Sequence, residues 1–349
     1  MKKLDGLQAL RGFAAAYVLL FHLVPVSGLG EAFPALRAVA RWGFAGVDLF
    51  FVLSGFVMWH TTIDRRGGGA ARTFLLKRCA RIYLGYWPWL ALALALFALL
   101  APQALAGKNL IGSLLLLDID DRRLVISVAW SLVFELYFYA LFAVLLLAGR
   151  RVRFAGVAAA AIGVALFNLA LLAWWPESLA GDAGEGHFFL SPFVAEFFAG
   201  SLLAAAWRAN FGGAARLPVA LVGLVLAVLG AWFGVAGGEL PAHQVQRLGS
   251  FGLAAAGLIL AVAALDARLH WPRWSVALGD SSYALYLGHP LLLSLATLGG
   301  WFAPGRAPIV AAALAAAAIG AAFLYHRCIE LPLYRRACMH IDARTPAEP

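Results

Sequence analysis

Charged residues are scarce in this sequence of 349 residues, where they account for 13% against about 25% in a typical soluble domain. Hydrophobic residues make up 63%, so a soluble fold would expose a large apolar surface to water. The three cysteines, Cys79, Cys328 and Cys338, lie in or beside segments predicted to be cytoplasmic, which argues against a disulfide framework. H-E-x-x-H and C-x-x-C motifs are missing, so we expect no metal and no permanently bound cofactor. These absences favour an integral membrane protein.

Apolar windows of the length needed to cross about 30 Å of hydrocarbon recur along the chain. The predicted spans are 6–25, 43–62, 82–101, 126–148, 154–175, 190–207, 217–236, 248–265, 276–297 and 308–326. The first is kept as a span because no A-x-A-like cleavage site follows it directly. The predicted fold class is therefore all-α, a polytopic bundle of about ten transmembrane helices. It would form one membrane domain over residues 1–340, followed by a short disordered cytoplasmic tail over 341–349.

Lysine and arginine are distributed unevenly between the predicted loops. With the N-terminus inside, 19 of them fall in cytoplasmic segments and 7 in external segments. This bias follows the positive-inside rule and places both termini in the cytoplasm. It also explains the net charge of +9 without nucleic-acid binding.

The first span contains two ionisable residues, Arg11 and His22. They are three helical turns apart, about 16 Å along the axis, and share one face because eleven residues rotate the helix to within about 20° of its starting direction. Ionisable groups inside a span are costly and are candidates for function. The alternative is that Arg11 reaches the headgroups and His22 is a satisfied interfacial histidine.

Asp48, near the outer end of the second span, is expected at a depth similar to that of His22, where it could fix the tautomer of the histidine. Alternatively, it is a solvated aspartate at a helix start. Gly55, in the same span, is interpreted as a close-packing position.

Glu135 lies deep inside the fourth span, and Ser131 and Tyr139 share its helix face at a spacing of four residues. A glutamate at this depth requires a partner or a water-filled cavity. A buried ion pair that only fixes packing remains the alternative.

The ninth predicted span carries a stripe of Tyr283, Tyr286 and His289, and Pro290 should kink the helix and free a carbonyl near His289. For the tyrosines, aromatic packing is the simpler interpretation. A basic cytoplasmic segment before the third span contains Lys77, Arg78 and Arg81, which could hold either lipid headgroups or a phosphorylated ligand.

With these residues in view, the chain resembles the acyltransferase-3 family of bacterial membrane acyltransferases. The opening LDGLQALRGFAAAYVLLFH carries an arginine and a histidine separated by ten residues, as in that family. Five further motifs match in order, ending at residue 335: GFAGVDLFFVLSGF, KRCARIY, SLVFELYFY, SSYALYLGHP and IELPLYR. One departure is that Leu84 and Gly85 follow the basic motif where the family often has proline, and Pro88 comes later.

The resemblance implies a multi-pass protein of the bacterial inner membrane. It also implies an acyl-CoA donor, usually acetyl-CoA, on the cytoplasmic side and a hydroxyl acceptor on a sugar or lipid-linked glycan. The opening LQALRG is most similar to members that act on exopolysaccharides. On this basis the catalytic prediction makes His22 the general base or a transient acyl carrier, oriented by Asp48 or Glu135. Arg11, Lys77, Arg78 and Arg81 are predicted to bind CoA phosphates. The predicted contacts to acceptor or oxyanion are Ser131, Tyr139, Tyr283, Tyr286 and His289.

Two other classes of function remain open from the sequence. A secondary transporter also has charges at mid-membrane, although it would typically show interrupted helices in two corresponding halves, and none are visible. A non-enzymatic scaffold of a polysaccharide synthesis complex is the second. The oligomeric state is not determined by the sequence.

Overall fold

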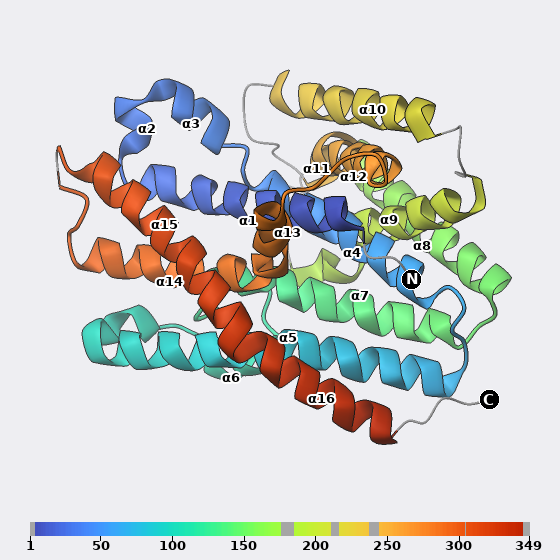
Figure 1. The fold of residues 1–349 in the computed structure, drawn as a ribbon, viewed down its shortest axis with the longest axis horizontal. Helices are drawn as coiled ribbons and strands as arrows, with labels where there is room; N and C mark the ends of the chain where they lie inside the picture. Colours follow the sequence, from blue (N-terminus) through green and yellow to red (C-terminus); the bar gives the residue numbers. More distant parts are fainter. Residues whose placement is uncertain (1–3, 176–184, 211–215, 237–243, 304, 345–349) are drawn as a thin grey trace. The chain divides into compact units, whose positions relative to one another are not determined.

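The computed structural model describes residues 4–175, 185–210, 216–236, 244–303 and 305–344 (Figure 1). Within these residues the regular structure is helical throughout. The long helices are α1 (Asp5–Val26), α4 (Ala45–Thr62), α5 (Gly68–Leu100), α7 (Trp130–Leu146), α8 (Arg150–Trp174), α9 (Pro192–Asn210), α10 (Arg216–Ala236), α12 (Leu253–Leu265), α14 (Ser282–Leu298), α15 (Ala307–Tyr325) and α16 (Leu331–Arg344). The shorter ones are α2 (Leu29–Ala32), α3 (Pro34–Ala40), α6 (Leu110–Leu115), α11 (Gln244–Arg247) and α13 (Arg273–Asp280).

The predicted membrane bundle is confirmed in its main features. Nine helical segments of the described residues are long and apolar enough to cross a membrane. The ninth predicted span, 276–297, is divided at Ser281 into α13 and the 17-residue α14. A multi-pass chain of helices follows from the composition, because only a helix satisfies all its backbone hydrogen bonds within one lipid-exposed segment.

Two boundaries differ from the sequence prediction. The helix that carries the third span begins at Gly68, so Lys77, Arg78 and Arg81 lie within α5 and not in a loop. Alanine, leucine, lysine and arginine are all good helix formers, which explains why this basic segment continues the helix. At the other end, α16 extends to Arg344, so the expected disordered tail is helical over 341–344, and 345–349 lie outside the described residues.

The chain divides into two compact units. Unit 1 comprises Met1–Gln8, Val47–Arg72 and Phe138–Pro272, and unit 2 comprises Ala9–Gly46, Thr73–Tyr137 and Arg273–Pro349.

Close backbone contact holds the helices of unit 1 together. A side chain at Gly55 of α4 would collide with the Phe197 carbonyl of α9, and one at Gly200 of α9 would collide with the Val52 carbonyl of α4. The Ser201 hydroxyl donates to the Gly55 carbonyl at 3.1 Å across the same contact. The close-packing interpretation of Gly55 is thus confirmed, in the manner of small residues at membrane helix interfaces.

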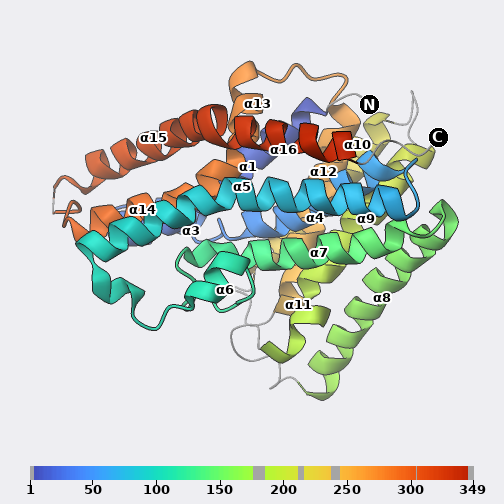
Figure 2. The ribbon, with the colours of Figure 1, turned by 90° about the horizontal axis from the view of Figure 1, so that it is seen from below.

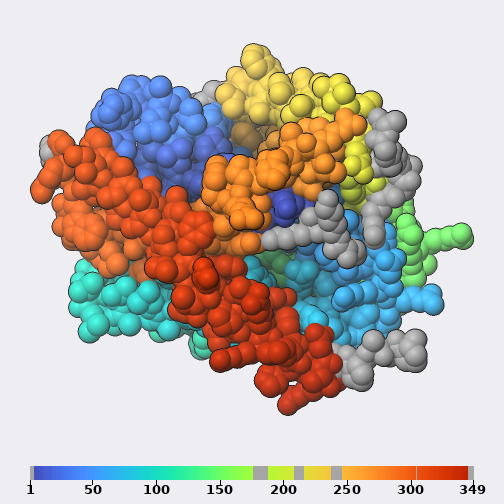
Figure 3. All heavy atoms as spheres, viewed as in Figure 1, coloured from blue at the N-terminus to red at the C-terminus, as the bar shows by residue number. Residues whose placement is uncertain are grey.

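In unit 2, α5, α14 and α15 run side by side (Figure 2). The hydroxyl of Tyr283 on α14 donates to the Ile82 carbonyl of α5 at 2.8 Å, and that of Tyr325 on α15 donates to the Gly85 carbonyl at 2.7 Å. The rings of Trp89 and Tyr325 lie 4.7 Å apart. On the face shown in Figure 3, α15 and α16 form one continuous ridge.

Candidate functional site

Two histidines from opposite ends of the sequence meet in unit 2. His22 lies one turn before the end of α1, and His289 lies in the middle of α14. The Nε2 atom of His289 is 3.1 Å from the Nδ1 atom of His22, and the ring centroids are 5.0 Å apart. His289 is buried, with 1% of its surface exposed, whereas His22 is partly exposed. One histidine therefore supports another that is accessible.

The hydrogen bonds assign the protons on this pair. The Nδ1 atom of His289 lies 3.0 Å from the Leu285 carbonyl, which can only accept, so this nitrogen carries the hydrogen. In neutral His289 the lone pair is then on Nε2, which faces His22 Nδ1. That Nδ1 also lies 3.0 Å from the Val18 carbonyl, so it donates to both acceptors. The Nε2 atom of neutral His22 is consequently left with its lone pair unused.

Pro290 contributes to this arrangement. Proline has no N–H, so the carbonyl of Tyr286 loses its usual helical donor. That carbonyl accepts from the His289 ring. The expected freed carbonyl near His289 is confirmed, while α14 continues through the proline to Leu298.

His22 lines a cavity of about 460 Å³, a volume within the range of small-molecule sites. Its walls are the C-terminal parts of α1, α5 and α14 together with the segment between α5 and α7. Most lining residues are apolar. The hydrogen-bonding ones, besides His22, are Lys108, Ser127, Ser294 and Thr297.

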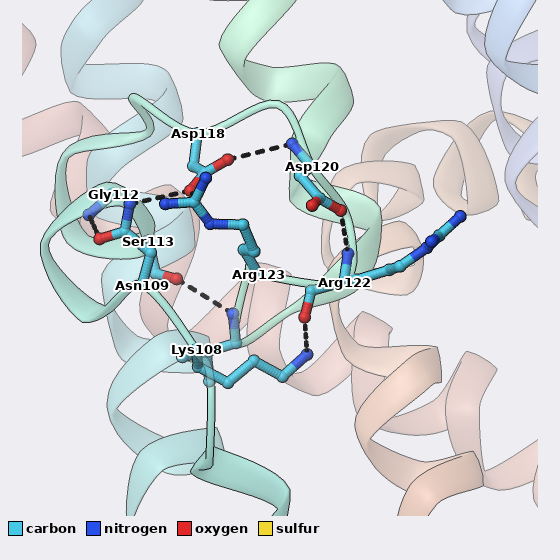
Figure 4. A network of polar contacts seen from close by, with 9 residues as sticks. Lys108, Asn109, Gly112, Ser113, Asp118, Asp120, Arg122 and Arg123 are labelled. Carbon is cyan, nitrogen blue, oxygen red and sulfur yellow. Dashed lines mark hydrogen bonds and ion pairs between the residues drawn. The ribbon is translucent and has the colours of Figure 1, made fainter. Parts of the chain in front are cut away.

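An ordered loop forms one wall of this cavity (Figure 4). Asn109 caps α6 by accepting from the Gly112 amide at 2.8 Å and donates to Asp118 at 2.8 Å. Asp118 in turn pairs with Arg123 at 3.3 Å. The side chain of Asp121, in the same loop, is exposed, and its charge acts on the His22 ring. These contacts hold a non-helical segment in a defined shape beside the histidine.

A second cluster of charge occupies the other half of α5. Arg81 pairs with Glu330 at 2.5 Å, and Glu330 is 1% exposed and also lies 3.0 Å from His326 Nδ1. Lys77 pairs with Asp342 of α16 at 2.6 Å. The Arg78 guanidinium lies over the Phe74 ring. Of the four cations predicted to bind phosphate, Lys77 and Arg81 therefore pair with carboxylates.

The two clusters of unit 2 are widely separated. Arg81 lies twelve positions before Ala93, the α5 residue of the cavity wall nearest to it in sequence, which corresponds to about 18 Å along the helix. Arg11 lies in α1 eleven residues before His22 and is partly exposed.

The polar residues that the sequence predicted for the site on α7 and α14 form two separate groups of contacts. Ser131 and Tyr286 share a hydrogen bond of 2.9 Å, and Tyr286 donates to the Val128 carbonyl at 3.0 Å. Both are buried. The charge of Glu135 acts on Tyr283, which is also near Arg81 and Glu330. The roles predicted for these residues in acceptor binding and orientation stay predictions.

Asp48 and Tyr139 belong to unit 1. Both carboxylate oxygens of Asp48 are bonded to Arg247, at 3.2 Å to Nε and 2.6 Å to Nη2. Asp48 is fully buried, so the interpretation as a solvated aspartate is wrong. Glu196, with 1% exposure, places its carboxyl group against Asp48. The orienting role of Asp48 stays a prediction.

Several of these residues were not predicted from the sequence. Glu196 is an ionisable residue within a span and could have been found by the criterion that identified Glu135. Ser294 and Thr297 follow Pro290 at i+4 and i+7, so the sequence alone could have placed all three on one face of the helix. For Lys108 the sequence shows only a cation in a predicted external loop, and nothing in it indicates that this residue lines a cavity.

A family model described as an acyltransferase domain matches residues 4–327. The chain belongs to the acyltransferase-3 family. It is 31% identical to the exopolysaccharide production protein ExoZ of Rhizobium meliloti (strain 1021), over 84% of this chain and 90% of that one. It is 28% identical to the acyltransferase MdmB of Streptomyces mycarofaciens, over 95% and 92% of the two chains. No solved structure matches it.

As a member of the acyltransferase-3 family, the chain is a multi-pass membrane enzyme that transfers acyl groups. Four of the motifs that this chain shares with the family contact one another in two pairs within unit 2. His22 of the first motif contacts His289 of SSYALYLGHP, and Arg81 of KRCARIY pairs with Glu330 of IELPLYR. Segments more than 240 residues apart in the sequence thus build two local sites.

Proposed function

We propose that this protein transfers an acetyl group from cytoplasmic acetyl-CoA to a hydroxyl of a cell-surface or exopolysaccharide glycan, or of its lipid-linked precursor. The observation that carries the proposal is the hydrogen bonding of His22 and its position on a cavity wall. Its Nδ1 is held by Val18 and His289, and the residue lines a cavity large enough for a ligand. The basic nitrogen Nε2 is therefore the one left for a substrate.

The chemistry follows from that nitrogen. Nε2 accepts the proton of the acceptor hydroxyl, whose oxygen attacks the carbonyl carbon of the acyl group. The carbon–sulfur bond then breaks, and the CoA thiolate leaves and takes up a proton. In a two-step variant the same nitrogen carries the acyl group as acyl-histidine before the hydroxyl attacks. In both variants the hydrogen bond to His289 orients the ring.

The donor is assigned to the opposite half of α5. CoA carries several phosphate charges, and Arg78 lies among cations, about 22 Å along the helix from Ala93 of the cavity wall. The lysine and arginine bias of the sequence assigns this half to the cytoplasm. The printed name of ExoZ, an exopolysaccharide production protein, supports a glycan as the acceptor class.

Membranes containing the His22→Ala variant test the proposal. With radiolabelled acetyl-CoA and total surface glycan, we expect transfer to fall by about 10²-fold or more, the usual contribution of a general base. His340→Ala, an exposed histidine of α16, is the matched control and should transfer at the normal rate. Unchanged labelling in His22→Ala, with equal expression, would contradict the assignment.

Mass spectrometry completes the test. Surface glycans from cells with and without the protein should differ by acetyl groups on hydroxyls, and rapid quenching should show whether the peptide containing His22 becomes acetylated. Glycans of identical acetyl content in both strains would refute a glycan acceptor.

A further inference from the structure

The cavity beside His22 carries hydrogen-bonding groups that the protein itself does not use. Ser127 and Ser294 line this space, and within the described part of the chain no hydrogen bond is found for their hydroxyls. Thr297 uses its hydroxyl as a donor to the Leu293 carbonyl at 2.9 Å. Polar groups left unpaired beside an apolar wall are expected to bond a ligand or water.

Lys108 is the one permanently charged residue among the described residues that line this cavity. Its ammonium donates to the Arg122 carbonyl at 2.7 Å, which occupies one of three donors, and no ion pair of Lys108 is found among the described residues. Figure 4 shows how that bond fixes the side chain across the loop. The neighbouring Arg123, by contrast, is paired with Asp118.

The position of Lys108 strengthens its effect on a ligand. The residue is half-buried, and the cavity beside it is bounded by apolar residues such as Phe97, Val125 and Leu293. A charge interaction is several times stronger in such surroundings than in open water. Since this loop is also ordered by hydrogen bonds, the ammonium is already positioned when a ligand arrives.

We propose that the acceptor bound in the His22 cavity is anionic and that Lys108 recognises its negatively charged group, while Ser127 and Ser294 bond its hydroxyls. The proposal rests on the proposed function, because it assigns the cavity to the acceptor. The anion is either a carboxylate of the glycan or the diphosphate of a lipid carrier. Lys108 is a specificity residue here and takes no part in the chemical step.

Binding without catalysis tests this proposal. Purified protein in nanodiscs is titrated calorimetrically, without acetyl-CoA, with three probes. These are a trisaccharide containing glucuronate, the same trisaccharide after carboxyl reduction, and a polyprenyl diphosphate carrying one glucose. We expect an anionic probe to bind the normal protein about tenfold more tightly than the neutral one.

The variants separate recognition of charge from the order of the loop. Lys108→Met should bind the anionic and neutral probes equally, and Lys108→Arg should retain most of the preference. Arg123→Gln is the matched control, because it removes a cation from the same loop that does not line the cavity, and the preference should survive. The anionic probe whose tighter binding is lost in Lys108→Met identifies the source of the anion, either the glycan carboxylate or the lipid diphosphate.

Several results would overturn the proposal: equal affinity of the normal protein for all probes, no binding of any probe, a preference that survives in Lys108→Met, or an equal loss in Arg123→Gln. The His22→Ala variant distinguishes failure of anion recognition by Lys108 from failure of the proposed acyl transfer. It should lose acetyl transfer and keep the Lys108-dependent binding preference.

Discussion

Replacing His289 with alanine should slow acyl transfer without abolishing it. The substitution removes the Nε2 acceptor that lies 3.1 Å from His22 Nδ1, while the Val18 carbonyl at 3.0 Å remains. The tautomer of His22 is therefore kept, and only one of two orienting hydrogen bonds is lost. One such bond contributes about 0.5–1.5 kcal/mol, so we expect kcat to fall about 2- to 12-fold.

The measurement uses purified protein in nanodiscs, radiolabelled acetyl-CoA and a fixed glycan acceptor. In His289→Ala the decrease should appear in kcat, with the KM of the acceptor nearly unchanged, because His289 is buried and does not line the cavity. In His289→Gln the amide oxygen can accept from His22 Nδ1 and should restore most of the rate. Thermal unfolding of each variant reports separately on the integrity of the fold.

Two results would refute this reasoning. If His289→Ala were as inactive as His22→Ala while remaining folded, His289 would take part in the chemistry itself. If both His289 variants worked at the normal rate, the hydrogen bond between the rings would have no role in orientation.

Two further predictions concern the charged residues. Arg78→Glu should raise the KM of acetyl-CoA at least tenfold and leave the KM of the acceptor unchanged, with the exposed Arg72→Glu as control; a larger effect on the acceptor would remove the donor from this half of α5. Arg247→Leu should destabilise unit 1 by about 3 kcal/mol or more, because it leaves the fully buried Asp48 without its partner. Thermal unfolding in detergent measures this, and an unfolding temperature equal to that of the normal protein would show that the pair does not stabilise the fold.

Local features of the fold could be predicted because they depend on neighbouring residues. The long apolar segments, the packing role of Gly55 and the carbonyl freed by Pro290 follow from hydropathy, residue size and backbone chemistry. The α5 helix begins fourteen residues before the predicted span 82–101. Polar residues of high helix propensity continue a helix beyond its apolar part, and a hydropathy window does not register them.

The site was only partly predictable. The sequence marked His22, Asp48 and Glu135 as costly in a membrane, but it paired Asp48 with His22 by depth alone. The structure pairs Asp48 with Arg247, which is 199 residues away and lies just before the eighth predicted span, 248–265. Depth along a span can be read from a sequence, whereas the direction in which a helix turns its polar face depends on its neighbours.

The sequence by itself thus determined that this protein is a helical membrane enzyme of the acyltransferase-3 family, and it predicted a histidine in the first span as the reactive group. Tertiary structure alone decided which groups hold that histidine. It brought His289 to His22 across 267 residues, left Nε2 as the basic nitrogen and placed Lys108 on the wall of the same cavity. The reason is physical: hydropathy and helix propensity act over a few turns, while a hydrogen bond between helices exists only after the helices have packed.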